Sequence, residues 1–400
     1  MTLTLLIDLD DTLLNNDIDV FIPVYLKALG KHLRNSVTPE TMIPSLLAAT
    51  QVMQKNNNPA LSLEGAFDQA FYPAIGQRKN ELRPLIEQFY DEIFPCLNTL
   101  TSPRPEAASM ITKVIEQGHQ VVIATNPLFP RKAILHRLRW AGLDPDLIPF
   151  SLITSYEGFH FAKPNPAYFA EIVAQSGYPN QPAVMVGNSL QDDLVPADQL
   201  GMPVFWVTPD HAQLPAGFHP LSASGSLDEI TVWLEKVDAA GIRPEIKTPA
   251  GLLAVLKSTP AAFDTLQKGL TIEQWRLKPE PDEWSLTEIF CHLRDVDREV
   301  NIPRFVKIIR EDNPFVVGID TDPWAEEREY RNSDGPTALR AYTNIRNQMV
   351  TLLESAKEED WHRPARHAIF GPTDLAELVS FVTIHDRSHV QQAFTTAQRV

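Results

Sequence analysis

The chain has 400 residues, a length typical of two domains, and its composition (44% hydrophobic, 22% charged) is that of a soluble globular protein. A formal net charge of -16 argues against non-specific binding to nucleic acid or to an anionic membrane, because both require a positive surface. No apolar run is long enough to span a bilayer, no signal peptide is recognisable, and Cys96 and Cys291 lie too far apart in sequence to indicate a disulfide framework. We therefore expect a cytoplasmic protein.

Residues 1 to about 208 alternate short apolar runs with amphipathic segments. The apolar runs lie at residues 3–7, 121–124, 183–186 and 204–207. Continuous runs of this kind are typical of buried strands in a parallel sheet covered by helices on both faces. Amphipathic segments at 107–117 and 130–141 precede Gly118 and Gly142, where helix C-caps are expected. The pattern predicts an α/β fold.

Residues of about 15–100 interrupt this alternation. They have a helical pattern that is broken by Asn-Pro at 58–59 and by Pro73. A helical insert of this size directly after the first strand predicts a cap over the active site. The core of the first domain then comprises residues 1–14 and 101–240.

The second half of the chain has a different pattern. Residues 238–249 contain several turn-forming residues and are predicted to be a linker. Beyond them helical periodicity dominates and strand signals almost vanish. We predict a separate all-α domain, a four-helix bundle, over residues 245–400.

Two carboxylates follow the first predicted strand, in the run Asp8-Leu-Asp10-Asp-Thr12. Ligands of open α/β sheets bind at this end of the strands. One carboxylate could attack phosphorus while the other moves a proton. Thr125 follows the second apolar run and could bind phosphate oxygens, and Lys163 could neutralise the charge of the nucleophile and of the phosphoryl group. Each residue alone also occurs in ordinary turns, caps or surfaces, but their order favours one phosphotransfer site.

The third apolar run ends in Gly-Asn188-Ser-Leu-Gln-Asp192-Asp193. Carboxylates here could complete a Mg²⁺ site, because magnesium prefers oxygen ligands. All of these groups follow strands, so they could converge on one edge of the sheet.

With these motifs in this order, residues 1–208 resemble the haloacid dehalogenase superfamily of phosphohydrolases. The resemblance implies a Rossmann-like domain, residues 1–240, with an inserted helical cap. By position it makes Asp8 the nucleophile that forms an aspartyl-phosphate and Asp10 the general acid/base. It also implies that Thr125, Asn126 and Lys163 bind phosphate or stabilise its charge, and that Asp8 and the backbone carbonyl of Asp10 hold Mg²⁺.

The fourth motif departs from the family pattern. The family usually has Gly-Asp where this chain has Asn188, which offers an oxygen but no charge. The spacing to Gly201 aligns Asp193 with the second acid of the motif, and Asp192 is an alternative replacement ligand. We expect weaker Mg²⁺ binding, with ligands drawn from Asp8, Asp10, Asn188, Asp192 and Asp193.

The resemblance leaves three functions open. The leading one is a Mg²⁺-dependent phosphatase for a small phosphorylated metabolite, because a cap excludes bulky substrates. A haloacid dehalogenase also uses an Asp nucleophile but does not need Mg²⁺. The third is a catalytically weakened scaffold whose C-terminal domain is the functional module.

The C-terminal half contains three histidines on two predicted helices. A capping box at 285–288 begins a helix that carries His292, and a second helix that begins near Asp374 carries His385 and His389. His385 and His389 are four residues apart and share a helix face. Together the three imidazoles predict a metal site in the bundle core.

These segments resemble the DinB/YfiT-like metalloprotein superfamily over residues 250–395. The matching residues are Trp284-Ser-Leu-x-Glu-Ile-x-x-His292-Leu and His385-Asp-x-x-His389-x-x-Gln392. The resemblance implies a divalent metal, Zn²⁺ or Ni²⁺, and some relatives are thiol-dependent transferases.

Other polar residues of this half have weaker assignments. We expect His362 and His367 at the surface and Cys291 in the core. Three acids are possible partners for the imidazoles or solvated helix charges, namely Glu288, Asp295 and Asp386.

Overall fold

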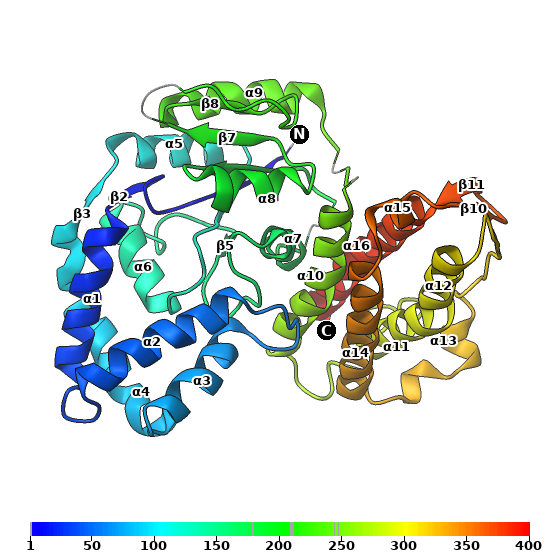
Figure 1. The fold of residues 1–400 in the computed structure, drawn as a ribbon, viewed down its shortest axis with the longest axis horizontal. Helices are drawn as coiled ribbons and strands as arrows, with labels where there is room; N and C mark the ends of the chain where they lie inside the picture. Colours follow the sequence, from blue (N-terminus) through cyan, green and yellow to red (C-terminus); the bar gives the residue numbers. More distant parts are fainter. Residues whose placement is uncertain (1, 178–179, 209–211, 244, 247) are drawn as a thin grey trace. The chain divides into compact units, whose positions relative to one another are not determined.

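The computed structural model describes residues 2–177, 180–208, 212–243, 245–246 and 248–400 (Figure 1). It divides into two compact units, Met1–Ile172 with Gln181–Pro244, and Val173–Asn180 with Glu245–Val400. In the described residues, no helix combines the length and the apolar character that a bilayer span requires.

A parallel sheet of six strands, counted over the described residues, forms the centre of the first unit. In spatial order the strands are β5 (Leu152–Ile153), β4 (Gln120–Ile123), β1 (Thr4–Ile7), β6 (Ala183–Gly187), β7 (Val204–Val207) and β8 (Ala223–Gly225). In the centre of the sheet, Leu5 lies opposite Val121 and Val184 on the neighbouring strands. All four residues of β1 are buried, so both faces of the sheet are covered. The four apolar runs are thus confirmed as strands.

Helices α5 (Pro105–Glu116) and α9 (Ile230–Ala240) pack over one face of this sheet, where they share a core with alternate residues of β1 such as Leu5 and Ile7. The remaining helices of the α/β part are α6 (Arg131–Trp140), α7 (Pro166–Gln175) and α8 (Val195–Asp198). The predicted α/β fold is therefore confirmed.

The insert after the first strand is helical, as predicted. Its helices are α1 (Ile18–Leu33), α2 (Pro39–Gln54), α3 (Leu63–Ala74) and α4 (Lys79–Gln88), followed by two short irregular helices, Phe89–Ile93 and Phe94–Leu100. The antiparallel strands β2 (Leu14–Asn16) and β3 (Thr101–Pro103) join the start of the insert to its end. Aromatic residues such as Phe21 and Phe94 form its own core, so the cap packs as a body on the sheet domain (Figure 1).

The second unit is the predicted four-helix bundle. Its long helices are α10 (Pro249–Gln267), α11 (Leu286–Val296), α14 (Gly335–Glu354) and α16 (Leu375–Arg399). Each of them packs against two others, so the bundle has a continuous core (Figure 1). Helix α11 continues through a π-helical turn, Asp297–Asn301, into α12 (Ile302–Arg310). The short helices are α13 (Trp324–Glu327), a 3₁₀ turn Tyr330–Asn332 and α15 (Glu358–Trp361).

A small sheet that the sequence pattern did not reveal lies beside the bundle helices. Its strands, in spatial order, are β11 (Gly371–Asp374), β10 (Pro364–His367) and β9 (Phe315–Val316). The expectation for His367 was therefore wrong: this residue ends β10 and is buried, whereas the side chain of His362 is exposed as expected. Cys291 is buried in the core, as predicted.

Candidate active site and candidate metal centre

The first candidate site lies where β1 ends. The backbone N–H of Asp8 donates to the carbonyl of Val186, so the parallel pairing with β6 continues to this residue. The Asp8 carboxylate is buried, lies 2.7 Å from the Nζ atom of Lys163, and accepts a hydrogen bond of 3.1 Å from the hydroxyl of Thr12. The sheet thus holds a carboxylate against a buried cation at its ligand-binding edge.

Lys163 also binds a second carboxylate. Its Nζ atom lies 2.6 Å from Asp193, which is buried as well and accepts a backbone hydrogen bond from Ser189. Burial opposes the charge on Lys163, but the carboxylates of Asp193 and Asp8 outweigh it and raise the pKa of the ammonium. Burial raises the pKa of Asp193 to about 6; Lys163 opposes this increase and Asp8 adds to it. The cluster has two acids and one base, and therefore an excess of negative charge.

The side chain of Asn188 joins this cluster through Thr12. The Thr12 hydroxyl lies 3.1 Å from a carboxylate oxygen of Asp8 and 3.3 Å from the amide oxygen of Asn188. A hydroxyl has one proton, so it can donate to only one of these two oxygens. The other oxygen keeps its lone pairs free. The carboxylate and amide oxygens here outnumber the hydrogen-bond donors, and oxygens of this kind are the ligands that a hard cation such as Mg²⁺ prefers.

Asp10 makes a hydrogen bond and an ion pair. Its carboxylate accepts a hydrogen bond of 2.9 Å from Asn16 and contacts the guanidinium of Arg137 on α6. Arg137 is fully buried and also lies over the rings of Phe21 and Phe129. Burial lowers the pKa of Arg137 to about 10, so it keeps its charge at neutral pH. The charged guanidinium of Arg137 therefore lies against the Asp10 carboxylate.

Thr125 and Asn126 follow β4, next to β1. Thr125 is buried, and its carbonyl accepts hydrogen bonds of 2.6 Å from Tyr168 and 2.8 Å from Thr154. These hydrogen bonds fix the backbone of the loop and do not involve the hydroxyl of Thr125. The amide oxygen of Asn126 is buried and has no hydrogen-bond partner among the described residues. This loop therefore has polar atoms to offer to a ligand.

The structure does not bring Asp192 into this cluster. Asp192 is exposed, and its carboxylate and its backbone N–H both bond to the hydroxyl of Ser189 at 3.1 Å. It acts as part of a helix cap, whereas Asp193, one residue later, points back to Lys163. Asp192 is therefore a poor candidate for the replacement ligand that the sequence suggested.

Two residues near this site were not found from the sequence. Arg137 lies in a segment with several basic residues, which resembles a solvated helix surface, and only the structure reveals that it is buried. Tyr168 lies on α7 and has no motif around it. Asp193 was found because the spacing of the fourth motif indicates it.

The second candidate site consists of three histidines in the bundle. Nε2 of His385 lies 3.2 Å from Nε2 of His292 and 3.1 Å from Nε2 of His389. One nitrogen from each ring lies within 4.8 Å of the other two, so a single metal ion could bind all three. Helix α11 supplies His292, and adjacent turns of α16 supply the other two.

The three imidazoles are held in the neutral form that metal binding requires. Burial, and then the neighbouring histidines, lower the pKa of His292 to about 3. Burial likewise lowers the pKa of His385 and of His389 to about 4. Nδ1 of His389 donates to the amide oxygen of Gln392, so Nε2 of this neutral ring carries a lone pair, which faces Nε2 of His385. This donor set fits a divalent transition metal.

The environment of these rings is partly aromatic. Trp284 stacks on His389 with an interplanar angle of 3° and also contacts His292. Nδ1 of His389 is hydrogen-bonded to the amide oxygen of Gln392 at 2.8 Å, which orients that ring. Nδ1 of His292 is buried and has no partner among the described residues.

The acids suggested as partners of the imidazoles bind other groups, because basic or hydroxyl groups lie nearer to each of them. In the structure Glu288 accepts from Ser285 in a capping box, Asp295 binds Arg294 and Tyr330, and Asp386 binds Arg346. Gln392 is the residue that supports the ring of His389.

Two family models match the chain. The haloacid dehalogenase-like hydrolase family matches residues 2–201, and the DinB superfamily matches residues 256–393. Among relatives, the uncharacterized protein YuaE of Bacillus subtilis is 28% identical over 139 residues, which cover 31% of this chain and 84% of YuaE. The pyrimidine 5'-nucleotidase YjjG of Escherichia coli is 28% identical over 132 residues, which cover 33% of this chain and 56% of YjjG. A protein named as a metal-dependent hydrolase in Geobacillus kaustophilus is 24% identical over 148 residues, which cover 37% of this chain and 83% of that protein.

Solved structures resemble both halves. A 2-haloacid dehalogenase from Pseudomonas syringae has 18% identity and a TM-score of 0.42, covering 59% of this chain and 100% of its own. YfiT from Bacillus subtilis, a four-helix bundle, has 17% identity and a TM-score of 0.35. The match covers 39% of this chain and 89% of YfiT. By its family matches, this chain belongs to the haloacid dehalogenase-like hydrolases and carries a DinB superfamily domain after the hydrolase domain.

Proposed function

We propose that the first domain is a Mg²⁺-dependent phosphatase that acts on a small phosphorylated metabolite. The observation that carries the proposal is the position of Asp8, which is buried at the end of β1 and lies 2.7 Å from Lys163. A carboxylate nucleophile needs such a cation, because its substrate is also an anion. The name of the relative YjjG, a pyrimidine 5'-nucleotidase, supports a phosphate ester as substrate.

In this proposal Asp8 attacks phosphorus, the bond from phosphorus to the ester oxygen breaks, and an aspartyl-phosphate forms. Lys163 stabilises charge on the phosphoryl oxygens, and Thr125 and Asn126 bind those oxygens. Bound Mg²⁺ would neutralise phosphate charge, and Asp8, Asn188, Asp193 and the carbonyl of Asp10 would hold it. Water then attacks the acyl-phosphate, which releases phosphate and regenerates Asp8.

Asp10 has the role of moving the proton. In its ionised form Asp10 can accept a proton from the water that attacks the aspartyl-phosphate. In its protonated form Asp10 can donate that proton to the leaving ester oxygen, so that the alcohol departs neutral. We propose that Asp10 donates its proton in the first step and regains one from the attacking water in the second.

The test is hydrolysis of p-nitrophenyl phosphate with and without Mg²⁺, for the wild type and for Asp8→Asn. We expect turnover that requires Mg²⁺ and is lost in Asp8→Asn. The exposed residue Asp146 offers a matched control, and Asp146→Asn should keep full activity. Turnover that persists in Asp8→Asn would refute the nucleophile.

Haloacid dehalogenation is the second candidate, since it also uses an Asp nucleophile but needs no metal. Asn188 favours it, because this residue leaves the cation site with one charge fewer than the family pattern provides. Asp10 and Thr12 favour phosphate. Halide release from 2-chloropropionate, measured alongside phosphate release, separates the two activities.

For the bundle we propose that His292, His385 and His389 bind one divalent transition metal, Zn²⁺ or Ni²⁺. The short distances between their Nε2 atoms support this. Elemental analysis should find about one equivalent in the wild type and much less in the double variant His292→Ala, His385→Ala; equal metal content would refute the site. If the first domain proves inactive, this metal site, with thiol-dependent transfer as one option, becomes the functional module.

A further inference from the structure

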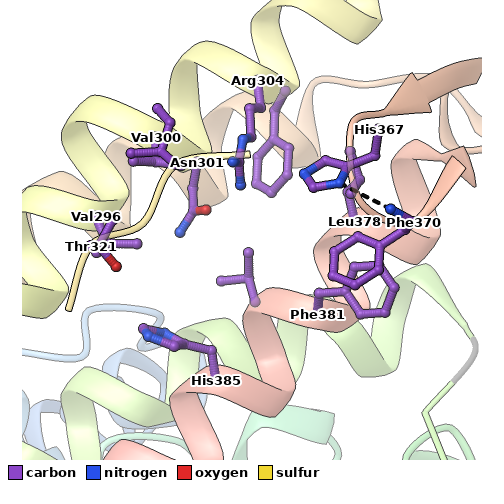
Figure 2. A pocket seen from close by; sticks show the side chains of 13 residues that line it. Val296, Val300, Asn301, Arg304, Thr321, His367, Phe370, Leu378, Phe381 and His385 are labelled. Atoms are coloured by element: carbon purple, nitrogen blue, oxygen red, sulfur yellow. Dashed lines mark hydrogen bonds between the residues drawn. The ribbon is translucent and has the colours of Figure 1, made fainter. Parts of the chain in front are cut away.

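A cavity of about 180 Å³ lies in the bundle unit, next to His385 and outside the ring of facing histidine nitrogens. Helices α12 and α16, the turn before α12, residues 319–321 and the small sheet surround it (Figure 2). Figure 2 shows Arg304 on one side of the cavity and His385 on the opposite side. Neither the phosphatase site nor the histidine triad accounts for this space.

Most of the cavity wall is apolar. The apolar lining consists of Val296, Val300, Phe305, Ile319, Phe370, Leu378, Phe381 and Val382. Ile319 and Phe370 are 46% and 53% exposed, so part of the apolar lining is accessible to solvent. An apolar cavity of about 150 Å³ is known to admit benzene. The space therefore suits an apolar body of about that size.

Arg304 gives the cavity an unbalanced positive charge. Its Nε atom is buried and has no hydrogen-bond partner among the described residues, while one terminal nitrogen donates to the carbonyl of Val317 at 2.7 Å. Burial alone lowers the pKa of Arg304, and no acidic side chain contributes to the shift. Of the described residues that line the cavity, none is acidic. Among the described residues, the half-buried guanidinium of Arg304 thus has an unpartnered N–H and no acidic partner, and an anionic ligand could supply both an acceptor and a counter-charge.

His367 adds a second polar group to the same wall. Its Nδ1 atom accepts the backbone N–H groups of Ile369 at 3.2 Å and Phe370 at 3.4 Å, so the neutral ring carries its proton on Nε2. Burial and then the charge of Arg304 lower the pKa of His367, which keeps the ring neutral at pH 7. The polar groups of this wall thus include a charged donor and a neutral donor, but no acid.

We propose that this cavity binds a small aromatic or branched aliphatic carboxylate, with the carboxylate on Arg304 and the apolar body among Phe305, Phe381 and Val382. Such a molecule accepts a hydrogen bond from the unpartnered Nε–H and pairs with the half-buried charge. Its apolar end lies toward His385, one of the three proposed metal ligands. The bundle would then act on, or sense, an organic acid rather than a phosphorylated compound.

The test is binding of phenylacetate to the full-length, metal-free protein, measured by calorimetry. Phenylacetamide has the same shape without the charge and is the matched ligand. A hydrogen bond to a charged group contributes enough that Arg304→Gln should weaken phenylacetate binding about 10- to 100-fold. Arg304→Gln should weaken the binding of phenylacetamide much less, because its amide oxygen can accept a hydrogen bond but carries no charge. Arg310 lies on the same helix, is exposed and does not line the cavity, so Arg310→Gln should bind phenylacetate like the wild type.

Two results would overturn the proposal: no binding of phenylacetate at millimolar concentration, or equal affinities for wild type and Arg304→Gln. Thermal unfolding excludes misfolding, because a folded Arg304→Gln variant should unfold in one cooperative transition with a midpoint close to that of the wild type. Since the protein is metal-free, the result does not depend on the histidine site. Failure of the metal proposal and failure of this one are therefore separate outcomes.

Discussion

Acidification of the metal-free protein should destabilise the bundle selectively, because three buried imidazoles are held neutral. In the folded chain the pKa is about 3 for His292 and about 4 for His385 and His389, whereas the ordinary value is 6.5. A base whose folded pKa is lowered takes up its proton in the unfolded chain first. Its contribution is therefore neutral above pH 6.5, and stability is lost as the pH falls from 6.5 toward 4.

The magnitude follows from the difference in bound protons. At pH 5.5 each of these imidazoles is about nine-tenths protonated in the unfolded chain and almost unprotonated in the folded one. One pKa unit corresponds to about 1.36 kcal/mol, so each ring lowers the free energy of unfolding by about 1.4 kcal/mol relative to pH 7.5. The three together remove about 4 kcal/mol, which is a large part of the 5–15 kcal/mol that is typical of a folded domain.

Hydrogen exchange of peptides from α11 and α16, combined with urea unfolding at pH 7.5 and 5.5, measures this loss. His389→Gln should remove about a third of the pH dependence. His362 is exposed in the same unit, so His362→Asn is the matched control and should behave like the wild type. If the wild type and His389→Gln lost equal stability on acidification, the imidazoles would not be the buried neutral groups that the structure shows.

Three further substitutions test the two units. A Cβ at Gly187 would lie 2.3 Å from a carboxylate oxygen of Asp193. Gly187→Ala should therefore displace that acid from Lys163 and abolish Mg²⁺-dependent hydrolysis in the phosphatase assay. Gly158→Ala is the control, because a Cβ at Gly158 would meet nothing within 4 Å. Arg346 is buried between Asp297 and Asp386, so Arg346→Leu should lower the free energy of unfolding in urea by about 3–5 kcal/mol. Asn188→Asp adds a charge to the cation cluster and should tighten Mg²⁺ binding, measured by calorimetry, at least about tenfold.

The sheet could be predicted because its inner strands are buried on both faces and therefore appear as continuous apolar runs. Strand β5 has two residues and β8 has three, too few to produce such a run. The same limit hid the small sheet of the second unit. The strands β10 and β11 meet at a turn in which Gly371 has a φ of 78°, and proline and histidine in these strands gave no strand signal.

The candidate sites were predictable where topology gathers residues that the sequence separates. Asp8 and Asp193 follow neighbouring strands, and the structure brings them together on Lys163. His385 and His389 are one helical turn apart, so the sequence spacing alone predicts that they lie close together. Arg137 and Arg304 were not predictable, because a buried arginine has the same local sequence signal as an exposed one.

Asn188 matters through the charge of the cluster. Asp8 and Asp193 bring two negative charges and Lys163 one positive charge, so the cluster has an excess of one negative charge. Aspartate in place of Asn188 would make the excess two, which would hold Mg²⁺ more tightly. At an effective dielectric of about 20, unit charges 4 Å apart interact by about 4 kcal/mol, so a carboxylate here would also repel each unit of charge on a bound phosphate by a similar amount. Asn188 therefore lowers the affinity for Mg²⁺ but also weakens the repulsion of an anionic substrate. We expect the binding of Mg²⁺ and the binding of the substrate at this site to depend on each other.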